Sequence, residues 1–132
     1  MFKEAYSFLL EILLDEEINQ HISKYVGKKL SIINAGAQVT SPSATITLNN
    51  GECTRASNTN REIGYQISFA LPFFGVNSFD KCLDFLDTVI PIFFEYRTKT
   101  IFIKSVSPLV IEHDNEIKSW VININVIVEV LI

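Results

Sequence analysis

Apolar and polar residues alternate along the C-terminal segment, residues 119–132. On one face the alternation places large apolar side chains, namely Trp120, Ile122, Ile124, Val126, Val128 and Val130. Asn123, Asn125 and Glu129 fall on the opposite face, which therefore tolerates water. A long β-branched run with this period predicts a central antiparallel strand with one dry side, around which the rest of the chain packs.

The N-terminal segment has a different period. From Phe2 to about Val26, apolar residues recur at steps of three and four with charged residues between them, which predicts one amphipathic helix. Gly27 is a natural stop for this helix. Its polar face is mainly acidic, whereas a helix on an anionic membrane surface needs Lys and Arg, so we expect it to form a layer of the core.

Two segments follow before the middle of the chain. Leu30–Gly36 is a short apolar piece, and Val39–Leu48 is a more polar strand. Pro42 lacks a backbone donor, which places this strand at a sheet edge, at least along its first half. Asn49–Asn60 has no periodicity and many turn-forming residues, so it predicts a long exposed loop that is mobile in the free subunit. Arg55 is the charge that could anchor this loop on an acidic partner.

The second half of the chain predicts two further strands and a helix. Ile63–Leu71 alternates as a strand, and a helix beginning near Ser78 carries an apolar stripe. Pro91 either kinks that helix or opens a short turn after it. A strand begins at Thr100, is interrupted at Pro108 and resumes up to Glu112, and a polar turn then leads to the final strand.

The order of elements is α-β-β-α-β-β. Strands joined by short turns pair antiparallel, so the expected fold class is α+β, with an antiparallel four-stranded sheet and two helices packed on one face. A length of 132 residues suits a single domain, 1–132.

Composition changes this picture in three ways. A hydrophobic share of 48% leaves apolar surface after a small core is filled, which favours a protein partner. The net charge of −4 disfavours nucleic acid as that partner. Cys53 and Cys82 lack the spacing of a metal or redox motif, so two reduced thiols in the cytoplasm are expected. Acidic residues interrupt the N-terminal segment, and we expect neither export nor a membrane span.

Candidate chemistry is sparse. His113 lies beside Glu112, Asp114 and Glu116, but neighbouring residues on a turn point in diverging directions, and the other histidine, His21, is far away in sequence. The acidic run 15–17 is typical of the solvated face of a helix. No phosphate-binding glycine loop or nucleophile motif is present in the sequence. We therefore expect no enzyme activity, no catalytic residue, no metal and no cofactor.

The aromatic residues are concentrated in the second half of the chain, and most of them are expected in the core. Adjacent doublets cannot all face the same side of a helix or strand, however. Some of the side chains at Phe73, Phe74, Phe85 and Phe94 should therefore lie at the surface, and a subunit interface is the expected place for them.

In this order of elements the chain resembles the tail-terminator, or tail-completion, proteins of long-tailed bacteriophages and related contractile particles. The resemblance covers nearly all of the chain: the N-terminal helix, the strands Val39–Leu48 and Ile63–Leu71, the helix containing Phe79, Leu83, Leu86, Val89 and Ile90, and the closing hairpin with Trp120-Val121-Ile122-Asn123-Ile124-Asn125-Val126. It implies a non-enzymatic homo-oligomeric ring, usually of six copies. Such a ring caps the tail tube, contacts the tail tube protein and a neck or connector protein, and is assembled in the bacterial cytoplasm into the virion.

Two other readings remain open. The region Phe73–Phe94 could form a pocket in a small apolar-ligand-binding domain or an enzyme, because apolar pockets are built from such residues. Alternatively, the chain could be an adaptor that adds a partner strand to the Val39–Leu48 edge. A ring favours the terminator, whereas a monomer that binds a small ligand saturably favours the pocket.

Overall fold

The computed structural model describes residues 1–34, 36–55 and 60–131, and for residues 50–55 it describes the backbone alone. Within these ranges it contains three α-helices and a five-stranded sheet. The elements in chain order are α1 (Phe2–Leu13), α2 (Glu16–Val26), β1 (Ser31–Ile33), β2 (Ser43–Arg55), β3 (Asn60–Leu71), α3 (Ser78–Glu95), β4 (Ile101–Asp114) and β5 (Ser119–Leu131).

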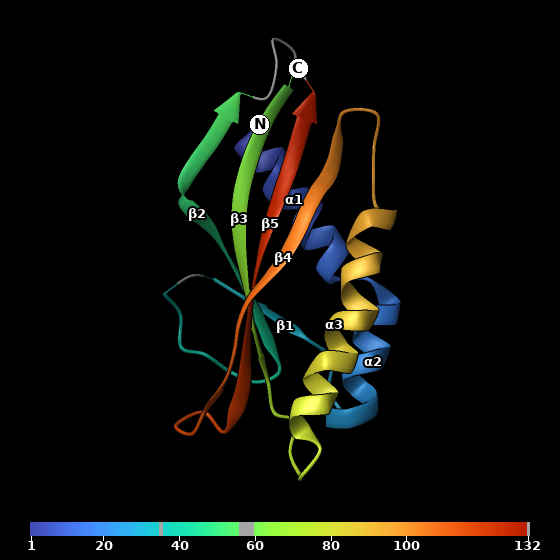
Figure 1. The fold of residues 1–132 in the computed structure, drawn as a ribbon, viewed down its shortest axis with the longest axis vertical. Coiled ribbons are helices and arrows are strands. Elements are labelled where there is room, and N and C mark those ends of the chain that lie inside the picture. The colour runs from blue at the N-terminus through green and yellow to red at the C-terminus, as the bar shows by residue number, and fades with distance from the viewer. Residues whose placement is uncertain (35, 56–59, 132) are drawn as a thin grey trace.

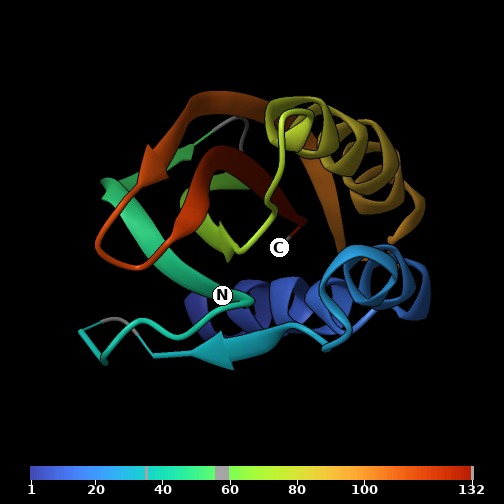
Figure 2. The same cartoon turned by 90° about the horizontal axis from the view of Figure 1, so that it is seen from below.

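The strand order across the sheet is β1-β2-β3-β5-β4. All neighbours pair antiparallel except β1 and β2, which are parallel. The sheet curves round from β4 to β1, and the helices lie along the open side of this curve (Figures 1 and 2). The α+β class and a mainly antiparallel sheet are confirmed, while the expected four strands and two helices are each one too few within the described residues.

The extra helix comes from a break in the N-terminal segment. The Asp15 side chain accepts hydrogen bonds from the backbone nitrogens of Glu17 (2.9 Å) and Ile18 (3.3 Å), so it caps a new helix, α2. An N-cap residue has a non-helical backbone, so the chain turns there while the apolar spacing continues. Gly27 ends α2 in the left-handed conformation, with φ of 78°, as expected of a C-terminal glycine. The expectation of one continuous helix was therefore wrong.

The extra strand is β1, which pairs with the first residues of β2, from Ser43 to Thr45. Pro42 lies just before β2, and its carbonyl accepts a hydrogen bond from the Ser31 nitrogen. The prediction that the first half of this strand forms the edge was therefore wrong. Within the described residues, β2 is at the sheet edge only from Ile46 onward.

The expected loop Asn49–Asn60 is in large part strand. β2 continues to Arg55 opposite β3, with a register irregularity between Leu48 and Cys53. Polar residues can extend a two-stranded ribbon because its ladder bonds come from the backbone, whatever the side chains bury. Residues 56–59 lie outside the described residues, so the prediction of mobility stays untested there.

Two prolines act more mildly than expected. Pro91 lies inside α3, which continues to Glu95. Pro108 does not interrupt β4, which runs from Ile101 to Asp114 with register irregularities between Ile103 and Ser105 and between Pro108 and Val110. Bulges let a strand accommodate a residue that cannot donate to the ladder.

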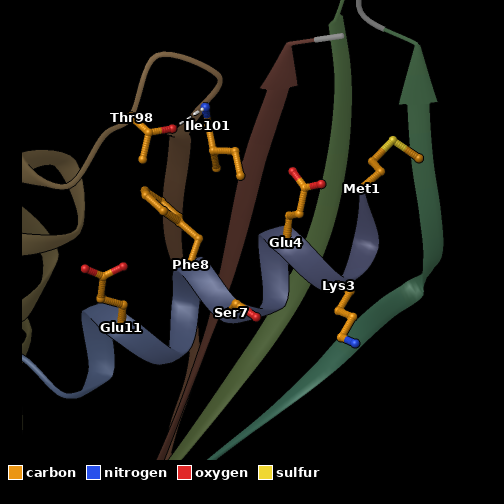
Figure 3. A pocket seen from close by; sticks show the side chains of 8 residues that line it. All are labelled: Met1, Lys3, Glu4, Ser7, Phe8, Glu11, Thr98 and Ile101. Carbon is orange, nitrogen blue, oxygen red and sulfur yellow. Dashed lines mark hydrogen bonds between the residues drawn. The ribbon is translucent and has the colours of Figure 1, made fainter.

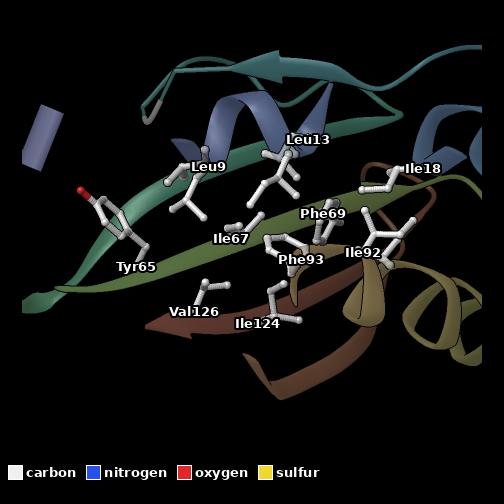
Figure 4. Packing of buried hydrophobic residues seen from close by; sticks show 14 of the residues in the cluster. Leu9, Leu13, Ile18, Tyr65, Ile67, Phe69, Ile92, Phe93, Ile124 and Val126 are labelled. Carbon is white, nitrogen blue, oxygen red and sulfur yellow. The ribbon is translucent and has the colours of Figure 1, made fainter. Parts of the chain in front are cut away.

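The core lies between the sheet and the helices. Ile67 and Phe69 of β3 and Ile122 and Ile124 of β5 are fully buried, as the alternation predicts. Leu9 and Leu13 of α1 and Phe93 of α3 pack toward these strands (Figure 4). Trp120 was also expected to be inaccessible, but it is only partly buried. It lies at the start of β5, where the centroid of its ring is 5.8 Å from that of Phe79 and 5.3 Å from that of His113, and its Nε1 has no hydrogen-bond partner within the described residues.

Candidate interaction surfaces

The four aromatic candidates divide into two core residues and two surface residues. Phe73 and Phe85 are buried, whereas Phe74 is 73% exposed and Phe94 is 48% exposed. The Phe85 ring packs edge-on against Phe69 with centroids 5.0 Å apart, and Phe73 packs against Tyr25 at 5.6 Å. Phe73 and Phe85 are therefore core residues and not candidates for an interface. The argument from adjacent aromatic residues predicts that one of two neighbours faces outward, but it does not predict which one.

The most exposed apolar side chains lie at the turn between β3 and α3, which we call the Phe74 tip (residues 74–76). Val76 is fully exposed, and Gly75, which lies between Phe74 and Val76, has a φ of 97°. Only glycine adopts this φ without strain, so it fixes the turn that presents both side chains. The tip lies at one end of the molecule, at the bottom of Figure 1.

A lysine of α3 supports the tip. Lys81 Nζ donates a hydrogen bond to the Phe74 carbonyl oxygen over 3.1 Å. The same ammonium lies 5.2 Å from the centroid of the Phe74 ring and 5.4 Å from that of Tyr25. Cation–π contacts of this length are attractive and orient a ring that water would otherwise surround. The tip is thus an apolar projection with a positive charge against its ring.

Further positive charge lies on the α2 side of this end of the molecule, whereas the β4–β5 hairpin with Glu112, Asp114 and Glu116 lies at the same end in Figure 1. Lys24 Nζ lies 5.5 Å above the Tyr25 ring, and Lys28 and Lys29 follow the C-terminus of α2. Asp80 and Asp84 of α3 lie in the same part of the sequence, so the charge is mixed on α3 itself. The lysines nevertheless make the α2 side of the tip basic in a chain whose net charge is −4.

At the opposite end, a surface cavity of about 500 Å³ opens between α1 and the segment that leads into β4 (Figure 3). We call this cavity the α1 pocket; it is lined by Met1, Lys3, Glu4, Ser7, Phe8, Glu11, Thr98 and Ile101. Glu4, Phe8 and Glu11 follow one another at helical spacing, so two carboxylates flank an aromatic floor. The rim opposite is fixed by Thr98 Oγ1, which accepts a hydrogen bond from the Ile101 nitrogen over 3.0 Å.

The carboxylates of the α1 pocket have no basic partner among the described residues. Within the described residues the one ion pair joins Lys104 of β4 to Glu62 of β3, which is part of the sheet and not of the pocket. Lys3 also lines the pocket, but its side chain points away from Glu4 and Glu11 in Figure 3. The pocket is therefore suited to a cationic group accompanied by an apolar one.

A second cavity, of about 320 Å³, lies at the open edge of β2 and is called the edge groove. Its lining is mostly apolar: Phe2, Lys3, Tyr6, Ile46, Thr47, Leu48 and Tyr65. The Tyr65 hydroxyl donates to the Phe2 carbonyl oxygen over 2.8 Å, which fixes the start of α1 over the sheet. Leu48 and Phe2 are each nearly half exposed, so the groove presents apolar surface beside the part of β2 that has no neighbouring strand among the described residues.

Glu112, His113 and Asp114 line another, more polar cavity together with Val110, Asn115, Val121 and Asn123. His113 Nδ1 lies 2.8 Å from Asn115 Oδ1, and Asp114 accepts a hydrogen bond from the Glu116 nitrogen. Both contacts are local to the turn. Among the described residues, no group of three or more His, Cys, Asp or Glu side chains is placed to hold a metal ion.

The titratable groups between α2 and α3 are structural in character. Burial raises the pKa of the Cys82 thiol to about 11, so it stays protonated at neutral pH and is a poor nucleophile. Burial lowers the pKa of His21, an effect that the Asp84 charge partly opposes, and the part of the chain that the structure describes offers the buried Nε2 of His21 no hydrogen-bond partner. Neither group forms an acid–base pair with the other candidates.

The side chain of Arg55 lies outside what the structure describes, so its expected role as an anchor stays a prediction. Neither the periodicity of apolar residues nor the argument from adjacent aromatic residues singled out Glu4, Glu11 or Lys81. Their signal in the sequence was weak: Glu4 and Glu11 are seven residues apart on either side of Phe8, and Lys81 lies one turn into the predicted helix near Ser78.

Comparison with known proteins adds no assignment: no protein-family model matches the chain, and no curated protein matches it significantly. None of the helices in the described residues has both the length and the apolarity needed to cross a membrane.

Proposed function

We propose that the chain is a structural subunit of the tail-terminator type. In this proposal several copies, six in the usual case, form a closed ring that caps the tail tube of a phage or phage-like particle. One side of the ring meets the tail tube protein, and the other meets a neck or connector protein. The subunit assembles in the bacterial cytoplasm and remains in the particle.

The observation that carries this proposal is the position of two unlike surfaces at opposite ends of the subunit. The Phe74 tip is apolar and projects, whereas the α1 pocket is hollowed and acidic. Unlike surfaces on one chain favour head-to-tail contacts, which close into rings when the rotation permits. The α+β fold is consistent with the same proposal, and α1, the β2–β3 pair, α3 and the β4–β5 hairpin keep the order on which the resemblance rests, with α2 and β1 added between them.

The pocket alternative is less well supported. A ligand between Phe73 and Phe94 would need space that the side chains of Phe73, Phe85 and Phe93 already fill, since all three are buried in the core. The cavities described above are lined by other residues and lie at the surface. An apolar ligand in this region would have to displace packed aromatic rings.

The strand-adding adaptor remains a second candidate because of the edge groove. β2 is open from Ile46 onward among the described residues, and Leu48 and Phe2 offer apolar contacts beside it. A partner strand could pair with the backbone there and place a side chain in the groove. The substitution Leu48→Glu separates this function from ring formation, because an adaptor should lose its partner while a terminator keeps its ring.

The experiment is deletion of the coding sequence from the particle that carries it, followed by electron microscopy of the lysate. We expect tubes of irregular length that are not joined to heads, and complementation with the wild-type chain should restore normal particles. Normal particles from the deletion would contradict the proposal.

A further inference from the structure

We propose that the Phe74 tip of one copy inserts into the α1 pocket of the next copy, with Lys81 placed against Glu4 and Glu11. This inference rests on the proposed ring and names the contact that builds it. The occupant of the pocket is therefore a second copy of this chain.

The arrangement of the two surfaces permits a repeating contact. In Figure 1 the turn between β3 and α3 lies at the bottom of the molecule, while the start of α1 and the connection from α3 to β4 lie at the top. A tip at one end and a pocket at the other cannot meet within one chain. Between copies they form a heterologous contact, which leaves one free tip and one free pocket for the next subunit until the ring closes.

Charge complementarity selects this pairing. The pocket holds two carboxylates without a basic partner among the described residues, and the tip holds the Lys81 ammonium against its ring. Met1, which is exposed, offers apolar contact to Phe74 and Val76, and the buried Phe8 and Ile101 line the base of the pocket. Removing an exposed aromatic ring from water while pairing its adjacent charge favours association on both counts.

The sheet edges are poorer candidates for the same contact. β4 carries two register irregularities and Pro108, and β2 carries an irregularity between Leu48 and Cys53. Bulges and edge prolines are features that hinder continuous pairing between edge strands. Side-chain insertion at the ends of the molecule does not meet this obstacle.

The test is charge exchange, read by sedimentation velocity over a range of concentrations. Lys81→Glu alone and the double variant Glu4→Lys/Glu11→Lys alone should each raise the dissociation constant by about tenfold or more. The triple variant carries the exchanged charges on both surfaces and should associate more tightly than either parent variant, but less tightly than the wild type because Lys81→Glu also removes the hydrogen bond to the Phe74 carbonyl oxygen. Phe74→Ser should weaken association without recovery by any charge change.

The matched controls change the same charges elsewhere. Glu112→Lys/Glu116→Lys and Lys118→Glu alter exposed residues of the β4–β5 hairpin by equal amounts and should leave association unchanged. Circular dichroism confirms that each variant is folded before it is compared.

The outcomes separate this contact from the proposed function. If the wild type forms a ring that the tip and pocket variants leave intact, the contact is wrong and the ring stands. Loss of association from Leu48→Glu with no effect of Glu4→Lys/Glu11→Lys would place the contact between copies in the edge groove and overturn the proposal. A wild-type chain that stays monomeric at every concentration contradicts both.

Discussion

The Tyr96 hydroxyl donates a hydrogen bond to Asp15 Oδ2 over 2.6 Å and so ties the end of α3 to the start of α2. The other oxygen of the same carboxylate, Oδ1, accepts from the backbone of Glu17 and Ile18. One side chain therefore caps a helix and joins two helices that form the layer over the sheet. The Phe74 tip lies at the far end of these helices, so its position depends on their packing.

This bond should be visible in the titration of Tyr96. The hydrogen bond to Asp15 raises the pKa of Tyr96 to about 12 from an ordinary value of 10.0, with smaller contributions from burial and nearby carboxylates. Because the folded protein holds this proton more tightly, stability is full below pH 10 and falls as the pH rises toward 12. We expect Asp15→Asn to shift the phenolate absorbance of Tyr96 to lower pH. An unchanged titration would show that the bond is absent in solution.

The lowered pKa of His21 should make the folded protein less stable at acid pH. Burial lowers its pKa from 6.5, so the unfolded chain binds the proton first and the free energy of unfolding falls as the pH drops below about 6.5. Chemical denaturation as a function of pH should show that His21→Phe removes this part of the acid slope. His113→Gln, which changes an exposed histidine, is the matched control and should retain it.

The two faces of the sheet should differ sharply in their contribution to stability, as Ile124 of β5 and Ser107, which pairs with Asn125, can show. Ile124 is fully buried, so Ile124→Ala should lower the free energy of unfolding by about 2–5 kcal/mol. Ser107→Ala on the neighbouring strand β4 changes an exposed side chain and should alter it by less than about 0.5 kcal/mol. Equal effects of the two substitutions in urea denaturation would contradict the assignment of faces.

The two kinds of aromatic residue should separate stability from association. Phe85→Ala empties a core position and should cost about 3–5 kcal/mol of stability. Phe74→Ser removes a ring that is mostly exposed, so the unfolding midpoint should barely move while self-association weakens. Phe94→Ser, at the exposed side of α3, tests whether every exposed phenylalanine behaves this way; we expect it to leave the tip contact intact.

The periodicity of apolar residues in the sequence predicted which faces of the strands are buried. The apolar faces of β3 and β5 followed from alternation, because successive side chains point to opposite sides of a strand. The opposite face of β5 is drier than expected, since Glu129 and the side-chain oxygens of Asn123 and Asn125 are buried. The break at Asp15 did not follow, since capping geometry competes with helical spacing at a single residue. The extension of β2 to Arg55 was also missed because its ladder depends on a distant strand, β3, and its polar sequence carries no strand signal.

The sequence predicted that some aromatic side chains are exposed, but it did not predict which ones or where the cavities lie. Surplus apolar residues indicated an interface, and Phe74 and Phe94 are exposed as that argument requires of some doublet members. The choice between Phe73 and Phe74 depends on the direction in which the chain leaves β3, which Gly75 sets through its backbone. The α1 pocket combines α1 with residues 98–101, and no local pattern joins segments so far apart.

The most direct test of the whole account is the mass of the wild-type protein in solution as its concentration is raised. Sedimentation equilibrium should show monomer converting to a single closed species larger than a dimer, whose mass stops increasing at high concentration. A species that remains monomeric, or a series of masses that grows without limit, would contradict the ring.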